Sequence, residues 1–124
     1  MAVPVPLSDS ACIGLYYGAI KNVCNRNLSV DFPLPYDNDN AGYLNFWFWG
    51  NTPSGSSGKV ACTLVGVSYD LSQMYFGQGA SLPANGQWLI SAGQSFKPTL
   101  EPQLYASCVL PPNGWIPGIQ WEFP

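Results

Sequence analysis

The chain has 124 residues, of which 47% are hydrophobic, 15% are aromatic and only 9% are charged. An average soluble domain carries roughly a quarter charged residues, so much of this surface must consist of uncharged polar and exposed apolar side chains. With only four cations and a formal net charge of −3, the chain cannot assemble the basic patch that nucleic acids and anionic membrane surfaces require. Its length suits a single domain, residues 1–124, around one hydrophobic core.

Glycine and proline punctuate the chain at a spacing of roughly eight to twelve residues, which is typical of an all-β sandwich or barrel. The expected strands, in chain order, cover residues 2–7, 12–17, 28–34, 43–49, 59–67, 88–91, 104–110 and 116–123. The stretch 19–27 has apolar residues at helical spacing, and we expect at most one or two helical turns there. Strands and helices do not alternate as in a parallel α/β fold. We therefore predict an all-β fold: an antiparallel, jelly-roll-like β-sandwich of about eight strands.

The four cysteines allow three disulfide pairings. The chain has no histidine and no C-x-x-C motif, so the spacing fits neither a zinc finger nor a redox motif. An even number of cysteines in a loop-rich chain of low charge favours disulfides over the alternative, four buried free thiols. Because strand alternation places Cys62 and Cys108 on apolar faces, we predict the pairs Cys62–Cys108 and Cys12–Cys24.

Disulfides form in oxidising compartments, so we expect an extracellular or cell-surface location. The sequence does not begin with the charged n-region and apolar h-region of a signal peptide. If the protein is exported, we expect that its signal peptide has been removed from this sequence. The longest apolar run lies within residues 43–49, far short of the ~20 residues of a spanning helix. No membrane span is expected.

Two segments of the chain resemble a pattern found in small secreted bacterial β-sandwich domains of unknown function. That pattern runs V-x-C-P-L-V in one strand, then Y-x-x-C-x-L-P-P and I-x-G-Y in two later ones. The matching residues are Val60, Cys62, Leu64, Val65, Tyr105, Cys108, Leu110, Pro111, Pro112, Ile116 and Gly118. The sequence departs from the pattern at Thr63, where a proline is usual, and at Ile119, where an aromatic residue is usual. The resemblance covers about a quarter of the chain and implies a secreted β-sandwich; it implies nothing about catalysis.

Groups suited to catalysis are sparse. Without histidine, proton transfer near neutral pH would fall on the seven Asp and Glu residues. A glycosidase needs two carboxylates that face each other across a groove, and the spacing pairs only Asp37 and Asp39, which share a loop. The GSSG sequence at 55–58 lacks the G-x-S-x-G spacing of a serine nucleophile. We therefore predict that the chain is not an enzyme.

The loop sequence Asp37-Asn38-Asp39-Asn40 is the candidate metal site. Hard oxygen ligands at alternating positions suit calcium, and Asp37, Asp39 and Asn40 would supply them. The favoured interpretation is an Asx-rich turn whose side chains bind nearby backbone groups, because the closing glutamate of an EF-hand loop is missing. We therefore expect no cofactor, with calcium as the alternative.

The segment 43–49, YLNFWFW, has two apolar faces. Alternation places Leu44, Phe46 and Phe48 on one face, and it places Tyr43, Asn45, Trp47 and Trp49 on the other. Three interpretations stay open: a strand buried on both faces, an aromatic platform for sugar rings, or a subunit interface. Trp88 and Trp115 are candidates to extend either functional surface.

Two functions from different classes follow. The first is a non-enzymatic, lectin-like, glycan-binding module that uses Tyr43, Asn45, Trp47, Trp49, Trp88 and Trp115. The second is a self-assembling structural subunit of a surface layer or filament, suggested by the low charge and by the apolar ends AVPVPL and GIQWEFP. The expected partners are therefore a glycan or copies of the chain itself, as a homo-oligomer, and not nucleic acid.

Overall fold

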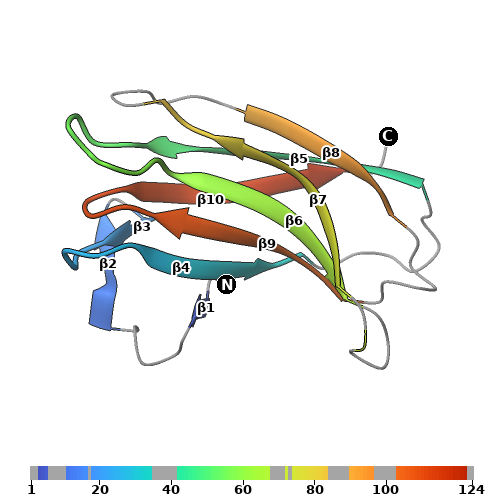
Figure 1. Ribbon diagram of the computed structural model, residues 1–124, viewed down its shortest axis with the longest axis horizontal. Helices are drawn as coiled ribbons and strands as arrows, with labels where there is room; N and C mark the ends of the chain where they lie inside the picture. The colour runs from blue at the N-terminus through green and yellow to red at the C-terminus, as the bar shows by residue number, and fades with distance from the viewer. Residues whose placement is uncertain are drawn as a thin grey trace.

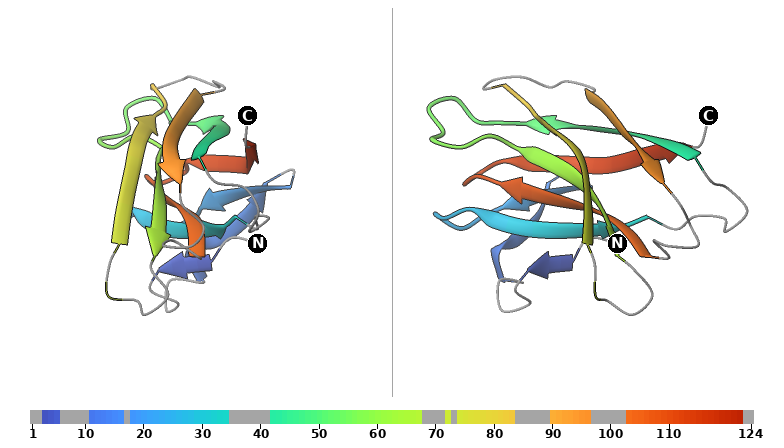
Figure 2. Two further views of the ribbon diagram at one scale, coloured as in Figure 1. Left: turned by 90° about the vertical axis from the view of Figure 1, so that its right-hand side faces the viewer. Right: turned by 45° about the vertical axis from the view of Figure 1, so that its right-hand side comes forward.

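The computed structural model describes residues 3–5, 11–16, 18–34, 42–67, 72, 74–83, 90–96 and 103–122 (Figure 1). These residues form ten strands and contain no helix that is long and apolar enough to cross a membrane. The strands make two antiparallel sheets of five strands each, which the further views of Figure 2 show from the side. The predicted antiparallel β-sandwich is confirmed, with two more strands than the sequence suggested.

Sheet A contains, in spatial order, β1 (Val3–Val5), β4 (Leu28–Pro33), β9 (Gln103–Leu110), β6 (Ala61–Val67) and β7 (Met74–Ser81). Sheet B contains β2 (Ile13–Tyr16), β3 (Ala19–Asn22), β10 (Trp115–Glu122), β5 (Gly42–Asn51) and β8 (Ile90–Phe96). Without the short edge strands β1 and β2, the orders β4-β9-β6-β7 and β3-β10-β5-β8 are those of an eight-stranded jelly roll.

Two expectations about individual elements were wrong. The expected helical turns at 19–27 are instead β3 followed by a tight connection. Tertiary packing decides this, because Ile20 packs against the core and the Asn22 side chain is fully buried. Strand β7 was not predicted, since Gly77 and Gly79 interrupt its apolar alternation and its pairing with β6 shifts register there. The strand expected at 88–91 is β8, which lies a few residues further on.

The core lies between the sheets and is built from alternate residues of sheet A. Its members include Leu28, Val30 and Phe32 of β4, Cys62 and Leu64 of β6, and Leu104, Ala106, Cys108 and Leu110 of β9. Phe48 and Ile116 face them from sheet B, both with 0% of their surface exposed. In β4, whose sequence is LSVDFP, buried residues alternate with partly exposed or exposed ones. Alternation along the strand therefore separates core residues from surface residues.

Both predicted disulfides are confirmed. We call Cys62–Cys108 the core disulfide; its two residues pair directly across β6 and β9, and both are buried. We call Cys12–Cys24 the N-terminal disulfide; it ties the segment before β2 to the connection after β3. The core disulfide closes a sequence separation of 46 residues and the N-terminal disulfide one of 12.

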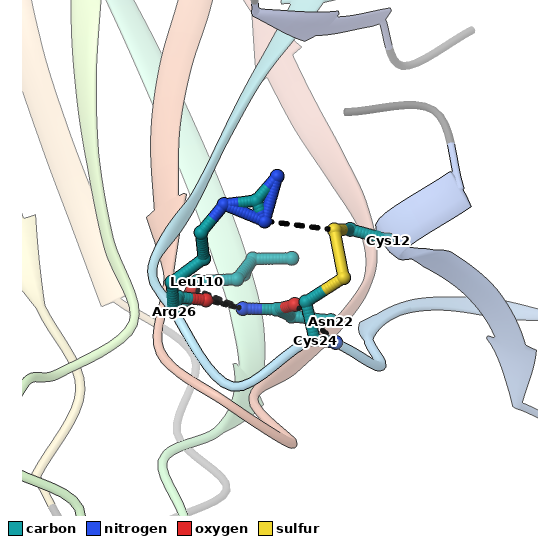
Figure 3. The surroundings of a disulfide bond; sticks show 5 residues. All are labelled: Cys12, Asn22, Cys24, Arg26 and Leu110. Carbon is teal, nitrogen blue, oxygen red and sulfur yellow. Dashed lines mark hydrogen bonds between the residues drawn. A yellow bond between two sulfur atoms is a disulfide. The ribbon is translucent and has the colours of Figure 1, made fainter. Parts of the chain in front are cut away.

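One end of the sandwich, on the left in Figure 1, carries the connections β3–β4, β5–β6 and β9–β10. The buried Asn22 amide holds two of them together (Figure 3): it donates to the backbone oxygens of Arg26 at 2.7 Å and Leu110 at 2.9 Å. Its Oδ1 accepts from the backbone N–H of Cys24 at 3.0 Å. The backbone of Asn22 also pairs with Gly114. Asn22 thereby fixes β3 beside the turn that leads into Trp115.

Candidate functional site

Strand β5 turns one side to the core and the other outward. Phe48 is fully buried, whereas Trp47 and Trp49, on either side of it, are partly exposed. Alternation therefore places both indoles on the outer face of sheet B. This part of β5 is not buried on both faces, so that interpretation of the two tryptophans no longer holds.

The neighbouring strands supply polar groups and small residues around these indoles. Trp47 pairs with Gln120 of β10 on one side and with Ser91 of β8 on the other. Trp49 pairs with Gly118, and the next outward residue of β5, Asn51, pairs with Trp115. Gln120 is exposed, and Asn51 is partly exposed. The Gln120 amide therefore lies beside Trp47, and the Asn51 amide lies beside both Trp49 and Trp115.

A β-bulge brings Trp115 onto the same face. Trp115 and Gly118 are three residues apart, so a regular strand would point them to opposite faces. Their partners Asn51 and Trp49 are two residues apart, and the pairing shifts register between them. The extra residue in β10 puts Trp115 and Gly118 on the same outer face. We call Trp47, Trp49 and Trp115 the aromatic face.

Two glycines lie at this bulge, and they differ in the space around them. At Gly50, which is buried, an added Cβ would collide with the backbone oxygen of Trp115 and press on Ile116. The close approach of the bulge to β5 therefore requires glycine at this position. At Gly118 an added Cβ would meet nothing within 4 Å. The surface directly across from Trp49 is consequently open.

A cation also lies at this face. Lys21 of β3 pairs with Trp115 and is partly exposed, on the side of β3 opposite to the buried Asn22. Trp115, Lys21 and Asn51 therefore form one row across β3, β10 and β5. Among the described residues, no three His, Cys, Asp or Glu side chains gather into a group that could hold a metal ion.

The predicted site residues divide into three groups. Trp47, Trp49 and Trp115 share the aromatic face. Tyr43 and Asn45 lie in β5 by their backbone, at positions that pair with Ser95 and Gly93; their side chains, like the whole of Trp88, lie outside what the structure describes. The calcium candidates Asp37, Asp39 and Asn40 also lie outside the described residues.

Sequence reasoning missed Gln120, Asn51, Gly118 and Lys21. Alternation along 116–123 could have placed Gln120 opposite the core, but it could not reveal the bulge that aligns Gly118 with Trp49. Lys21 was missed because 19–27 was expected to contain helical turns.

The end of the sandwich has two open depressions of its own. One, of about 320 Å³, is lined by residues 53–57 of the β5–β6 connection with Pro112 and Asn113. The other, of about 370 Å³, is lined in the described chain by Cys24, Asn25 and Arg26. Neither has a described lining residue from the aromatic face.

No protein-family model and no curated protein matches the sequence. Solved structures with a similar fold include the xylan-binding module CBM15 (TM-score 0.55, 8% identity, 88% of this chain and 80% of that chain). They also include TmCBM61 in complex with β-1,4-galactotriose (TM-score 0.54, 10% identity, 100% of this chain and 88% of that chain). A third is the enzymatically active domain of tailspike protein 4 from bacteriophage CBA120 (TM-score 0.55, 9% identity), where the match covers 83% of this chain but only 15% of the tailspike chain.

At these identities the likeness establishes the fold alone. The chain has the antiparallel β-sandwich architecture that carbohydrate-binding modules also use.

Proposed function

We propose that the protein is a non-enzymatic glycan-binding module and that the aromatic face is its binding site. The observation that carries the proposal is the gathering of Trp47, Trp49 and Trp115 on one outer sheet face, beside the open surface at Gly118. An indole presents a wide, flat, apolar area with a polar edge, which suits the C–H face of a sugar ring.

The spacing on the strand also suits a chain of sugars. Trp47 and Trp49 are two residues apart, so their Cα atoms are about 7 Å apart along β5. Gln120 and Asn51 can donate and accept hydrogen bonds from sugar hydroxyls, since a side-chain amide has both functions. A linear glycan laid along β5 would therefore meet successive rings and amides.

The comparisons and the cysteines support the same proposal. Two proteins of similar fold are carbohydrate-binding modules, one xylan-binding and one in complex with β-1,4-galactotriose. The two disulfides suit a protein that works outside the cell, where glycans are exposed. The absence of histidine and of a spaced carboxylate pair from the sequence supports binding without catalysis.

The test is binding to xylan and to β-1,4-galactotriose, with affinity electrophoresis for the polymer and calorimetry for the trisaccharide. We expect Trp49→Ala to weaken binding by about thirtyfold, since a central aromatic anchor contributes about 2 kcal/mol. Asn25→Ala is the control, because Asn25 is exposed in the β3–β4 connection and belongs to no proposed binding surface. Each assay is run with calcium and with EDTA, which tests whether binding depends on calcium, as the predicted ligands Asp37, Asp39 and Asn40 would require.

The outcome that contradicts the proposal is a Trp49→Ala protein that binds as tightly as the wild type. Unchanged melting temperature in the same variant separates loss of a site from loss of the fold.

A second candidate function is self-assembly through the sheet edges. Leu15 on the edge strand β2 is 84% exposed, and Phe76 on the edge strand β7 is 69% exposed. Exposed apolar groups on an edge strand favour pairing with another copy. Size-exclusion chromatography over a range of concentrations tests this, and a monomer at all concentrations would remove the candidate.

A further inference from the structure

The outer face of sheet A, on the opposite side of the sandwich, carries a row of short side chains at one register level. Asp31 of β4 pairs with Ser107 of β9, Ser107 with Thr63 of β6, and Thr63 with Gly79 of β7. We call these four residues the polar strip. Adjacent strands lie about 4.8 Å apart, so the strip crosses the sheet over about 14 Å.

The groups of the polar strip are hydrogen-bonding groups near the surface. Asp31, Ser107 and Thr63 are partly exposed, and Gly79 is exposed. An added Cβ at Gly79 would lie 2.9 Å from Oγ1 of Thr63. The threonine hydroxyl therefore reaches toward β7, over a position that carries no side chain.

Asp31 has more acceptor capacity than its described neighbours use. The Ser107 side chain forms a hydrogen bond with the carboxylate, whereas an ionised carboxylate has about four lone-pair sites. Burial raises the pKa of Asp31 above 3.8, and the bond from Ser107 offsets this in part. The carboxylate is thus partly desolvated and is suited to accept further donors.

One register level further along the strands, larger side chains border the polar strip. Tyr105 pairs with Val65, and Val65 pairs with Phe76. Val65 is only 1% exposed, but Phe76 is 69% exposed and Tyr105 is partly exposed. The strip therefore has an aromatic side chain beside each half, Tyr105 toward Asp31 and Phe76 toward Gly79. We call Tyr105 and Phe76 the aromatic border; Val65 between them is buried and offers no surface to a ligand.

We propose that the polar strip and its aromatic border form a second ligand site, which takes a neutral saccharide. The strip offers a carboxylate and hydroxyls, so its ligand must bring hydrogen-bond donors. Neither the strip nor the border contains a cation, so among these described residues nothing would offset the repulsion between Asp31 and an anionic ligand. Sugar hydroxyls are neutral donors, and the C–H face of the ring matches the exposed Phe76 ring. The site does not depend on the aromatic face, which lies on the other sheet.

The experiment measures retardation in gels that contain galactomannan or hydroxyethylcellulose, both neutral, or polygalacturonate, which is anionic. Wild type, Phe76→Ala and Trp49→Ala are compared with the double variants Trp49→Ala/Phe76→Ala and Trp49→Ala/Asp31→Asn. Asn25→Ala is the control, because Asn25 is exposed and lies in neither site. Once Trp49→Ala has removed the aromatic face, we expect the added Phe76→Ala to weaken the remaining binding to a neutral polymer at least tenfold, and the added Asp31→Asn to weaken it less. Polygalacturonate should not retard the Trp49→Ala protein.

The variants separate this proposal from the function proposed above. If Trp49→Ala alone abolishes all binding, the aromatic face stands and the second site is overturned. If Trp49→Ala changes nothing and Phe76→Ala abolishes binding, the second site stands and the aromatic face is overturned. A Trp49→Ala/Phe76→Ala protein that is retarded as strongly as the Trp49→Ala protein overturns the second site. Wild-type protein that no neutral polymer retards also overturns it.

Discussion

Replacing Asn22 by alanine tests how the loop end of the sandwich is held together. The Asn22 side chain is 0% exposed and makes three hydrogen bonds, to the backbone of Arg26, Leu110 and Cys24. A typical intramolecular hydrogen bond contributes a net of about 1 kcal/mol, and more is lost where a buried partner is left unsatisfied. At about 1 kcal/mol for each of the three bonds, we expect Asn22→Ala to lower the free energy of unfolding by about 3 kcal/mol. We expect no larger loss, because only the bond to Leu110 is fully buried.

Guanidinium unfolding of the oxidised protein measures this value, and the slope of the transition should not change. For a chain of this length we expect the melting temperature to fall by roughly 12 °C. Asn25→Ala is the matched control, since Asn25 is an exposed asparagine in the same connection, and it should stay within about 0.5 kcal/mol of wild type. An Asn22→Ala protein as stable as the Asn25→Ala protein would refute the reasoning.

Three further results are expected. Thr52→Val should cost about 2 kcal/mol in chemical unfolding, because the buried hydroxyl donates to the Leu82 oxygen at 3.0 Å and accepts from the Val60 N–H at 2.9 Å; Thr52→Ser should recover most of the loss. Removing the core disulfide with paired alanines should cost about 4 kcal/mol, against about 3 kcal/mol for the N-terminal disulfide, since it closes the longer loop; equal losses would contradict this. The pKa of Asp31 is raised in the folded state by burial, so the fold binds its proton more tightly than the unfolded chain does. Wild-type stability should therefore fall as pH rises from about 3.8 through the raised value. Asp31→Asn should gain stability relative to wild type over that window, measured by unfolding at a series of pH values, and the opposite slope would contradict the sign.

Much of the architecture could be predicted because period-2 alternation is a local signal. The burial pattern of β4, the inward Phe48 and the inward Cys62 and Cys108 all follow from alternation alone. The pairing of the two mid-strand cysteines followed from the same argument, and the register confirms it.

The elements that failed are those whose structure depends on distant contacts. The segment 19–22 is a strand because Asn22 bonds to Leu110, which is 88 residues away. Strand β7 pairs with β6 through a register shift, which its glycines permit. Its own sequence has no alternation from which this pairing could be predicted.

The candidate site shows the same division. Alternation predicted that Trp47 and Trp49 share a face, but it could not predict that Trp115 joins them, because one extra residue in β10 reverses the parity. The polar strip was also beyond the sequence, since it consists of single residues from four strands that only the register brings into line.

The most direct test of the central claim, that the aromatic face binds a glycan, is the affinity of a Gly118→Val protein for the glycans that the wild type binds. The position is open to a Cβ, so the valine should leave the fold and its melting temperature nearly unchanged while it fills the surface across from Trp49. We predict that binding falls at least tenfold in Gly118→Val. A Gly118→Val protein that binds its glycan as tightly as the wild type would contradict the account.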